Sequence, residues 1–324
     1  MLTEVMEQFG LAKGLRQAGY FETDDHQRLL KDLKTSIYDG ELIVLAGIVG
    51  CGKTTLLWRL QERLRQEAKV HVTESLAFDV PRVNLVTLKL AMFYDLASEK
   101  DGDLTLKPEK SERRLLDLIR QRERPVVLFC DDAHDLHAQT LRGLKQFMEK
   151  VAKRGNRLSV VLAGHPKLKN ELVNRSTLEE IAARTTVFEL EGIKGHQRRY
   201  LTWLLEQCLQ PEIKLSDVLT DDAVTLLTER LVTPLQINHY LTRALEQAHR
   251  FGEKPVTADI VEAAMAPDIN TLEPILIRHG YNTKVLCELF NARLAEVRAF
   301  LRGQLPADRT EELKQQILKE GVSL

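Results

Sequence analysis

The 324-residue sequence predicts an α/β protein in which a parallel sheet is covered by helices and followed by purely helical segments. Apolar strand patterns alternate with helical patterns up to residue 192, and from about residue 193 only helical patterns remain. Strands that are separated by helices need crossover connections, which favours a parallel sheet buried on both faces. The length is enough for two or three packed units.

Composition and charge narrow the class of protein. Hydrophobic residues make up 44% and charged residues 29% of the chain, which is typical of globular proteins. The formal net charge is −1, so binding to nucleic acid would need local basic patches. The four cysteines are scattered without metal-ligand spacing and indicate reduced thiols. The polar N-terminus and the absence of long apolar runs predict a cytoplasmic protein without membrane segments.

The individual elements of the α/β part follow from local patterns. Residues 1–36 form a predicted N-terminal helical element, in which Thr23 and two aspartates could cap a helix. A further helix is expected near 82–97, and the charged, aperiodic segment 98–114 is predicted to be a surface loop. The predicted strands are 41–46, 69–75, 125–132, 158–164 and 185–192.

The most informative element follows the first predicted strand, where the sequence GIVGCGKTT occupies 47–55. Glycines in such a loop let several backbone N–H groups point at one anion, and the following helix adds the positive end of its dipole. Lys53 can reach the β- and γ-phosphates, and the Thr54 hydroxyl can bind Mg²⁺. The pattern therefore predicts binding of ATP and Mg²⁺. The predicted cofactor-binding residues are Gly47, Gly50, Cys51, Gly52, Lys53, Thr54 and Thr55.

Polar residues at the ends of two later strands are candidates for the chemistry. Asp131 ends an apolar strand 78 residues after Lys53 (131 − 53) and is the predicted metal-associated carboxylate. The next residue, Asp132, is placed to orient or deprotonate the attacking water, or alternatively to cap a helix. His165 follows the strand 158–164 and is a candidate sensor of the γ-phosphate, with a structural role as the alternative.

An arginine at the edge of the domain could act on a neighbouring subunit. Arg184 lies just before the last predicted strand and is the candidate arginine finger, with Arg175 as its competitor. A solvated surface role is the alternative for either side chain.

The second half of the chain is predicted to be helical. Four helical patterns over 193–268 suit a lid that closes over a nucleotide, and the middle of 269–324 suggests two short helices joined by a turn near 291–293. The predicted domains are thus the N-terminal element 1–36, a nucleotide-binding core 37–192, the lid 193–268 and a C-terminal segment 269–324.

Two groups of basic residues are candidates for contact with double-stranded DNA. The C-terminal helix pair is compatible with a helix-turn-helix, although Glu288 and Glu296 lie close by, and a protein-docking tail or plain packing are the alternatives. Its candidate residues are Arg293, Arg298 and Arg302. A second group could line a ring and track phosphates, with a solvated helix face as the alternative. Its members are Arg82, Lys145, Lys150, Lys153 and Arg154.

The ordered motifs resemble one branch of a known family over roughly residues 20–265. The motifs are GIVGCGKTTLL, FCDDAHDL, VVLAGHPKL, IAARTTVFEL and TPLQINHYLTRALEQA. Together they resemble the ExeA/TnsC-like branch of the AAA+ ATPases, which includes transposition helpers of the TniB and MuB type. The resemblance implies an AAA+ αβα sandwich with a helical lid. It also implies an ATP-dependent homo-oligomer, as a ring or helical filament on duplex DNA, that recruits or activates a DDE transposase or integrase.

Three positions depart from the family pattern. Asp132 stands where glutamate is more common, and His165 stands where many relatives have glutamine or threonine. Leu235 occupies the place of the lid arginine, with Gln236 beside it as a weaker hydrogen-bonding substitute. These departures favour slow hydrolysis, with ATP acting as an assembly switch. The alternatives are a secretion-pathway ATPase like ExeA and a nucleotide-switched DNA-binding scaffold with little hydrolysis.

Overall fold

A computed structural model describes residues 2–74, 84–98, 108–133, 136–169, 185–266, 272, 276, 281–301 and 304–322. The chain divides into two compact units. The sheet unit comprises Thr23–Gly47 and Lys53–Leu190, and the helical unit comprises Met1–Glu22, Ile48–Gly52 and Glu191–Leu324. The predicted N-terminal element 1–36 is therefore shared between the two units.

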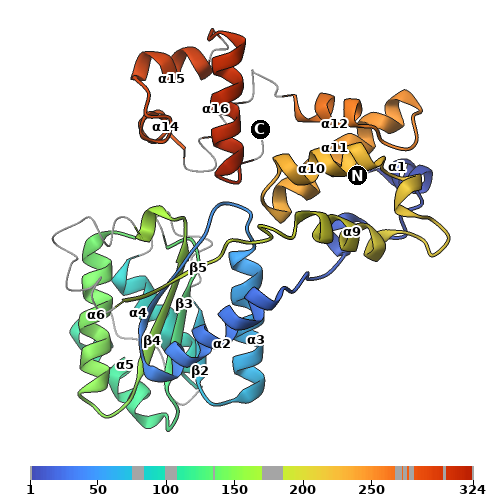
Figure 1. Ribbon diagram of the computed structural model, residues 1–324. Helices are drawn as coiled ribbons and strands as arrows, with labels where there is room; N and C mark the ends of the chain where they lie inside the picture. Colours follow the sequence, from blue (N-terminus) through green and yellow to red (C-terminus); the bar gives the residue numbers. More distant parts are fainter. Residues whose placement is uncertain are drawn as a thin grey trace. The chain divides into compact units, whose positions relative to one another are not determined.

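The sheet unit contains the parallel sheet that the sequence predicts (Figure 1). Its strands are β1 Leu42–Ala46, β2 His71–Glu74, β3 Val126–Cys130, β4 Leu158–Gly164 and β5 Thr185–Glu189. They lie in the order β2-β3-β4-β1-β5, and every neighbouring pair is parallel. The three central strands are buried along their whole length, which explains why their sequences are continuous apolar runs.

Helices cover both faces of this sheet (Figure 1). Helices α2 and α3 pack together on one face, whereas α4, α5 and α6 pack together on the other. Their bounds are α2 Asp24–Asp39, α3 Lys53–Glu67, α4 Leu85–Leu96, α5 Pro108–Gln121 and α6 Ala138–Ala152.

Helix α5 corrects the prediction of a surface loop over 98–114, because residues 108–114 form its first turns. The apolar side chains that α5 buries, such as Leu115, Leu116 and Ile119, come only after the charged segment ends. A window over 98–114 therefore contains the solvated turns of the helix and misses its apolar face. Residues 99–107 lie outside the described part of the chain.

Helix α2 begins where the sequence predicts a cap and is tied to the sheet at its other end. The Thr23 hydroxyl accepts a hydrogen bond from the backbone N–H of His26 at 3.2 Å. At the C-terminal end, the buried Ser159 hydroxyl donates to the Ile37 carbonyl at 2.5 Å. This bond satisfies a helix-end carbonyl and places α2 directly before β1.

The helical unit contains the four predicted lid helices and two N-terminal pieces around one apolar core. Val5 and Phe9 of the first helix are buried in that core together with the lid leucines. The helices are α1 Thr3–Phe9, α9 Gln197–Cys208, α10 Asp221–Arg230, α11 Pro234–Phe251 and α12 Ala258–Met265, with a short 3₁₀ turn at Leu15–Gln17.

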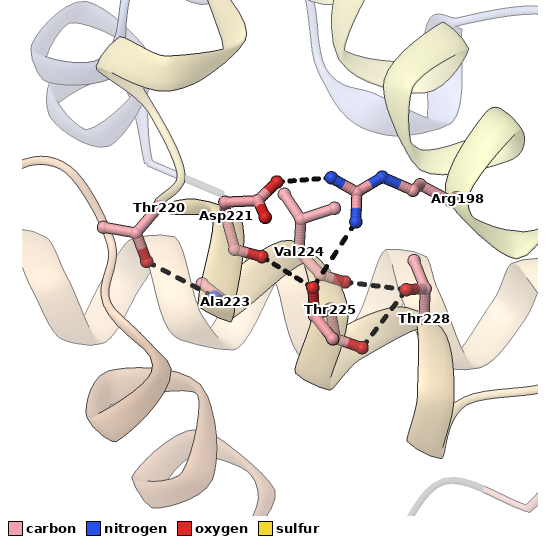
Figure 2. Close-up of polar contacts among 7 residues, drawn as sticks. All are labelled: Arg198, Thr220, Asp221, Ala223, Val224, Thr225 and Thr228. Carbon is pink, nitrogen blue, oxygen red and sulfur yellow. Dashed lines mark hydrogen bonds and ion pairs between the residues drawn. The ribbon is translucent and has the colours of Figure 1, made fainter.

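Polar contacts join the first two lid helices (Figure 2). The Arg198 guanidinium of α9 forms an ion pair with Asp221 in the first turn of α10 and a 3.4 Å hydrogen bond to the Thr225 hydroxyl. Thr220 caps α10 by accepting from the Ala223 N–H at 3.3 Å. The contacts fix the start of α10 beside α9.

The C-terminal segment has a small core of its own. Two short helices, α14 Thr283–Leu289 and α15 Leu294–Leu301, are joined by a turn in which Asn291 has a φ of 47°. This confirms the predicted helix pair. A third helix, α16 Ala307–Lys319, was not predicted. Within the described residues, no helix is both long and apolar enough to cross a membrane.

Candidate nucleotide-binding site

The predicted phosphate loop lies between the end of β1 and the start of α3. Gly50 and Gly52 have φ values of 75° and 103°, a left-handed conformation that glycine adopts without a steric penalty. The Gly47 N–H donates to the Gly164 carbonyl at 3.2 Å, so the loop starts beside the end of β4. The loop therefore has the strand–loop–helix setting that a phosphate site requires.

The two residues predicted to hold Mg²⁺ lie in contact. The Thr54 hydroxyl donates to the Asp131 carboxylate at 2.6 Å, and the Lys53 ammonium donates to the Gly47 carbonyl at 2.8 Å. Hydroxyl and carboxylate oxygens are the hard ligands that Mg²⁺ prefers. The described residues contain no group of three or more His, Cys, Asp and Glu side chains able to hold a metal. An Mg²⁺ ion bound here would have Thr54, Asp131, phosphate oxygens and water as its ligands.

Asp132 has an unusual backbone conformation for a residue with a side chain. Its φ is 51°, and its N–H donates to the Asp131 carboxylate at 2.9 Å. Left-handed non-glycine residues are uncommon and gather at functional sites. Helix α6 begins at Ala138 with His137 as its N-cap, but Ala133, directly after Asp132, has 3₁₀ conformation, so capping of that turn stays the alternative role. The Asp132 side chain is exposed, as a group that meets water must be.

His165 directly follows β4, which lies between β3 and β1 in the sheet. The carboxyl ends of neighbouring parallel strands meet at one edge, so His165 and Asp131 share the edge that carries the loop. The His165 Nδ1 atom accepts from the Lys167 N–H at 3.4 Å, and the ring is half-buried. The position suits the predicted sensor role.

The lid residue at the place of the family arginine carries no charge. Leu235 is 43% exposed, whereas Gln236 is fully buried. The Gln236 carbonyl oxygen accepts from the Val232 and Thr233 N–H groups, and its amide donates to two carbonyls near the C-terminus. Both the oxygen and the nitrogen of the Gln236 side chain are thus used in hydrogen bonds within the helical unit, so Gln236 does not substitute for the arginine.

Four predicted site residues cannot be placed. Both arginine-finger candidates and two DNA-contact candidates lie outside the described residues. They are Arg184, Arg175, Arg82 and Arg302.

Most of the remaining basic candidates on α6 and just after its end are paired with acids. Lys150 forms an ion pair with Glu112 of α5, and Arg154 pairs with Asp117 of the same helix at 2.7 Å. Lys145 lies 3.9 Å from Glu149, whereas Lys153 is exposed. The partners on α5 could not be recognised from sequence, because that helix was not predicted. Pairing lowers the positive charge that this face offers to a phosphate backbone.

The C-terminal candidates differ from those on α6. Arg293 and Arg298 are exposed, and the nearby Glu296 pairs with Arg309 of α16 at 2.8 Å. Of the two acids near the helix pair, Glu296 is thus paired with a residue that no sequence pattern singles out.

The sheet has the strand order 5-1-4-3-2, a glycine loop follows β1 and an acid follows β3. These features are those of the P-loop AAA+ fold. Comparison with known proteins agrees: residues 37–172 match the family model described as AAA domain. No curated protein matches the sequence.

Solved structures share the fold at low sequence identity. The Cdc6 protein of Pyrobaculum aerophilum is 17% identical, with a TM-score of 0.57 and 98% of each chain covered. The ORC2 protein of Aeropyrum pernix, solved in ADPNP–ADP complexes, is 15% identical, with a TM-score of 0.55, covering 96% of this chain and 91% of that one. Drosophila ORC bound to DNA is 15% identical, with a TM-score of 0.55, covering 97% and 82%.

Proposed function

We propose that this chain is an AAA+ ATPase that assembles on double-stranded DNA in its ATP-bound state and recruits or activates a DDE transposase. The observation that carries the ATPase part is the 2.6 Å hydrogen bond between Thr54 and Asp131, beside a loop closed by Lys53. It brings together two residues 77 positions apart in the chain, as a Mg²⁺–triphosphate site requires.

Each residue of the candidate site has a distinct role in the proposed hydrolysis. Lys53 binds the β- and γ-phosphates, while Thr54 and Asp131 would hold a Mg²⁺ ion, which would neutralise phosphate charge. Asp132 accepts the proton of the attacking water as the bond between the γ-phosphorus and the bridging oxygen breaks. His165 contacts the γ-phosphate or that water. Without a cation at Leu235, charge developing on the phosphate is less well stabilised, so turnover is slow.

The DNA part of the proposal rests on three supports. The motif order resembles transposition helper ATPases, and structures with the same fold include Drosophila ORC bound to DNA and the Aeropyrum pernix ORC1 protein in complex with DNA. In addition, Arg293 directly before α15 and Arg298 within it are exposed. The transposase partner is supported by the sequence resemblance alone.

Nucleotide binding and hydrolysis are tested by matched pairs of variants. Thr54→Val should abolish Mg²⁺-dependent hydrolysis, whereas Thr54→Ser keeps the hydroxyl and should retain most of it. Lys53→Ala should abolish binding of a fluorescent ATP analogue. Retained micromolar affinity in Lys53→Ala, or equal turnover in the two Thr54 variants, would refute the assignment of the loop.

Assembly on DNA is tested with a non-hydrolysable ATP analogue and duplex DNA, followed by negative-stain microscopy. We expect oligomers only when both are present, and monomers under all conditions would exclude the proposal. Arg293→Glu with Arg298→Glu should weaken DNA binding and reduce the salt-dependence slope by about two. Arg28→Glu, at an exposed arginine of the sheet unit, changes the net charge by as much as either single substitution and is the control for each of them.

A nucleotide-switched scaffold is the second candidate, because Leu235 and the shorter Asp132 both weaken catalysis. Asp132→Asn separates the two. In an ATPase this variant slows turnover and spares assembly. In a scaffold the wild-type turnover is already at background, and the variant changes neither property.

A further inference from the structure

The end of α16 lies against the phosphate loop inside the helical unit. Gly321 follows the C-cap of α16 and has a φ of 82°. A Cβ atom built at Gly321 would lie 2.3 Å from the Val49 carbonyl oxygen and 3.2 Å from side-chain atoms of Ile48 and Thr233. No real Cβ approaches another heavy atom at 2.3 Å, so a side chain here displaces either the helix end or the loop.

Gln236 fixes this helix end in place. Its amide nitrogen donates to the Leu318 carbonyl at 2.8 Å and to the Val322 carbonyl at 3.2 Å. Leu318 lies in the last turn of α16 and Val322 lies just beyond it, so the side chain spans the helix end. Leu318 is buried in the lid core, whereas Val322 is buried in the core of the C-terminal segment. The last turn of α16 therefore joins the C-terminal segment to the lid.

The same lid residues also contact the loop. The Leu235 N–H donates to the Gly50 carbonyl at 3.4 Å, and a Cβ at Gly50 would lie 3.1 Å from the Thr233 hydroxyl. Thr233 is fully buried and lies near both Gly50 and Gly321. Loop, lid and helix end thus meet around one threonine, so a shift of α16 changes the surroundings of loop residues 48–50.

We propose that the end of α16 is a regulatory clamp on the phosphate loop, through which the C-terminal segment sets nucleotide affinity. The proposal rests on the nucleotide-binding function proposed above. When the clamp is seated, it holds the backbone of Ile48 and Val49 in the binding conformation. Coupling between two sites is reciprocal. A macromolecule that binds 281–322 and displaces α16 therefore changes the affinity for ATP, and ATP changes the affinity for that macromolecule by the same factor.

Two glycines provide a matched test. Gly252, the C-cap of α11, has a φ of 69°, and a Cβ there would meet nothing within 4 Å. Gly321→Ala and Gly252→Ala therefore impose similar backbone strain, but only the first displaces the loop contact. We expect Gly321→Ala to weaken binding of the ATP analogue at least about five-fold, the lower end of typical couplings, and Gly252→Ala to leave it unchanged.

A second measurement follows the helix itself. In the wild-type chain, the analogue should slow hydrogen exchange over 307–322, and this protection should be lost in Gly321→Ala. If Gly321→Ala does not fold, protection of 307–322 by the analogue in the wild-type chain still decides the proposal. Equal affinities in the two glycine variants, or unchanged exchange on nucleotide binding, would overturn the clamp. Absence of nucleotide binding in the wild type would instead overturn the proposed function.

Discussion

The strongest prediction for stability concerns Gln236, whose side chain is 0% exposed and makes hydrogen bonds in two directions. In Gln236→Leu, which is similar in volume, four backbone groups each lose one hydrogen bond: the Val232 and Thr233 N–H groups and the Leu318 and Val322 carbonyls. The Leu318 carbonyl keeps its bond from the Gly321 N–H at 2.9 Å. At about 1 kcal/mol for each lost bond, the helical unit should be destabilised by about 4 kcal/mol. That is a large fraction of the stability of a typical domain.

The assay is urea unfolding followed by tryptophan fluorescence in a Trp58→Phe background. The remaining tryptophan, Trp203, lies on α9 in the same unit as Gln236, so its signal reports that unit. Gln315→Leu on α16 is the control, because Gln315 makes one exposed hydrogen bond to Glu311 at 2.9 Å. The control should stay within about 0.5 kcal/mol of wild type. The reasoning is refuted if the free energy of unfolding of Gln236→Leu lies within about 1 kcal/mol of wild type, which is the contribution of about one hydrogen bond.

Three further predictions test other features. Asp132→Gly and Asp132→Ala should both lose hydrolysis. The alanine variant should be less stable than the glycine variant by about 1 kcal/mol because of the positive φ, and equal thermal midpoints would contradict this. Burial, and to a smaller extent the charges of Arg122 and Arg124, lower the pKa of His71 below 6.5. Near that pH the unfolded chain therefore binds more protons than the folded chain, and stability should fall as the pH drops through 6.5. The fall should be smaller in His71→Gln. Arg198→Ala should cost less than about 1 kcal/mol in urea unfolding, because its ion pair with Asp221 is exposed.

The parts of the fold that sequence predicts are those in which local pattern and burial agree. The three central strands are continuous apolar runs because both of their faces are covered, so their positions could be predicted closely. The contact between Thr54 and Asp131 could also be expected, because residues at the carboxyl ends of parallel strands meet at one edge.

The parts that sequence missed depend on distant partners. Helix α16 is largely polar and buries only Leu313, Ile317 and Leu318, so its pattern is weak without the core it packs against. Gln236 finds two of its acceptors 82 and 86 residues away, which no local pattern encodes. The left-handed φ of Asp132 likewise arises from its surroundings, since aspartate has no intrinsic need for it.

The register of β1 has a consequence for the order in which the protein folds. Leu42 pairs with Val160 on one side and Thr185 on the other, partners 118 and 143 residues later (160 − 42 and 185 − 42). During synthesis, the strand that leads into the phosphate loop has no neighbour until the chain has grown past residue 164, and it has both neighbours only past residue 189. Such distant pairings form late and slowly. A nascent chain that ends before β4 should therefore leave its first strand exposed, and ATP can stabilise only the chain that has passed this point.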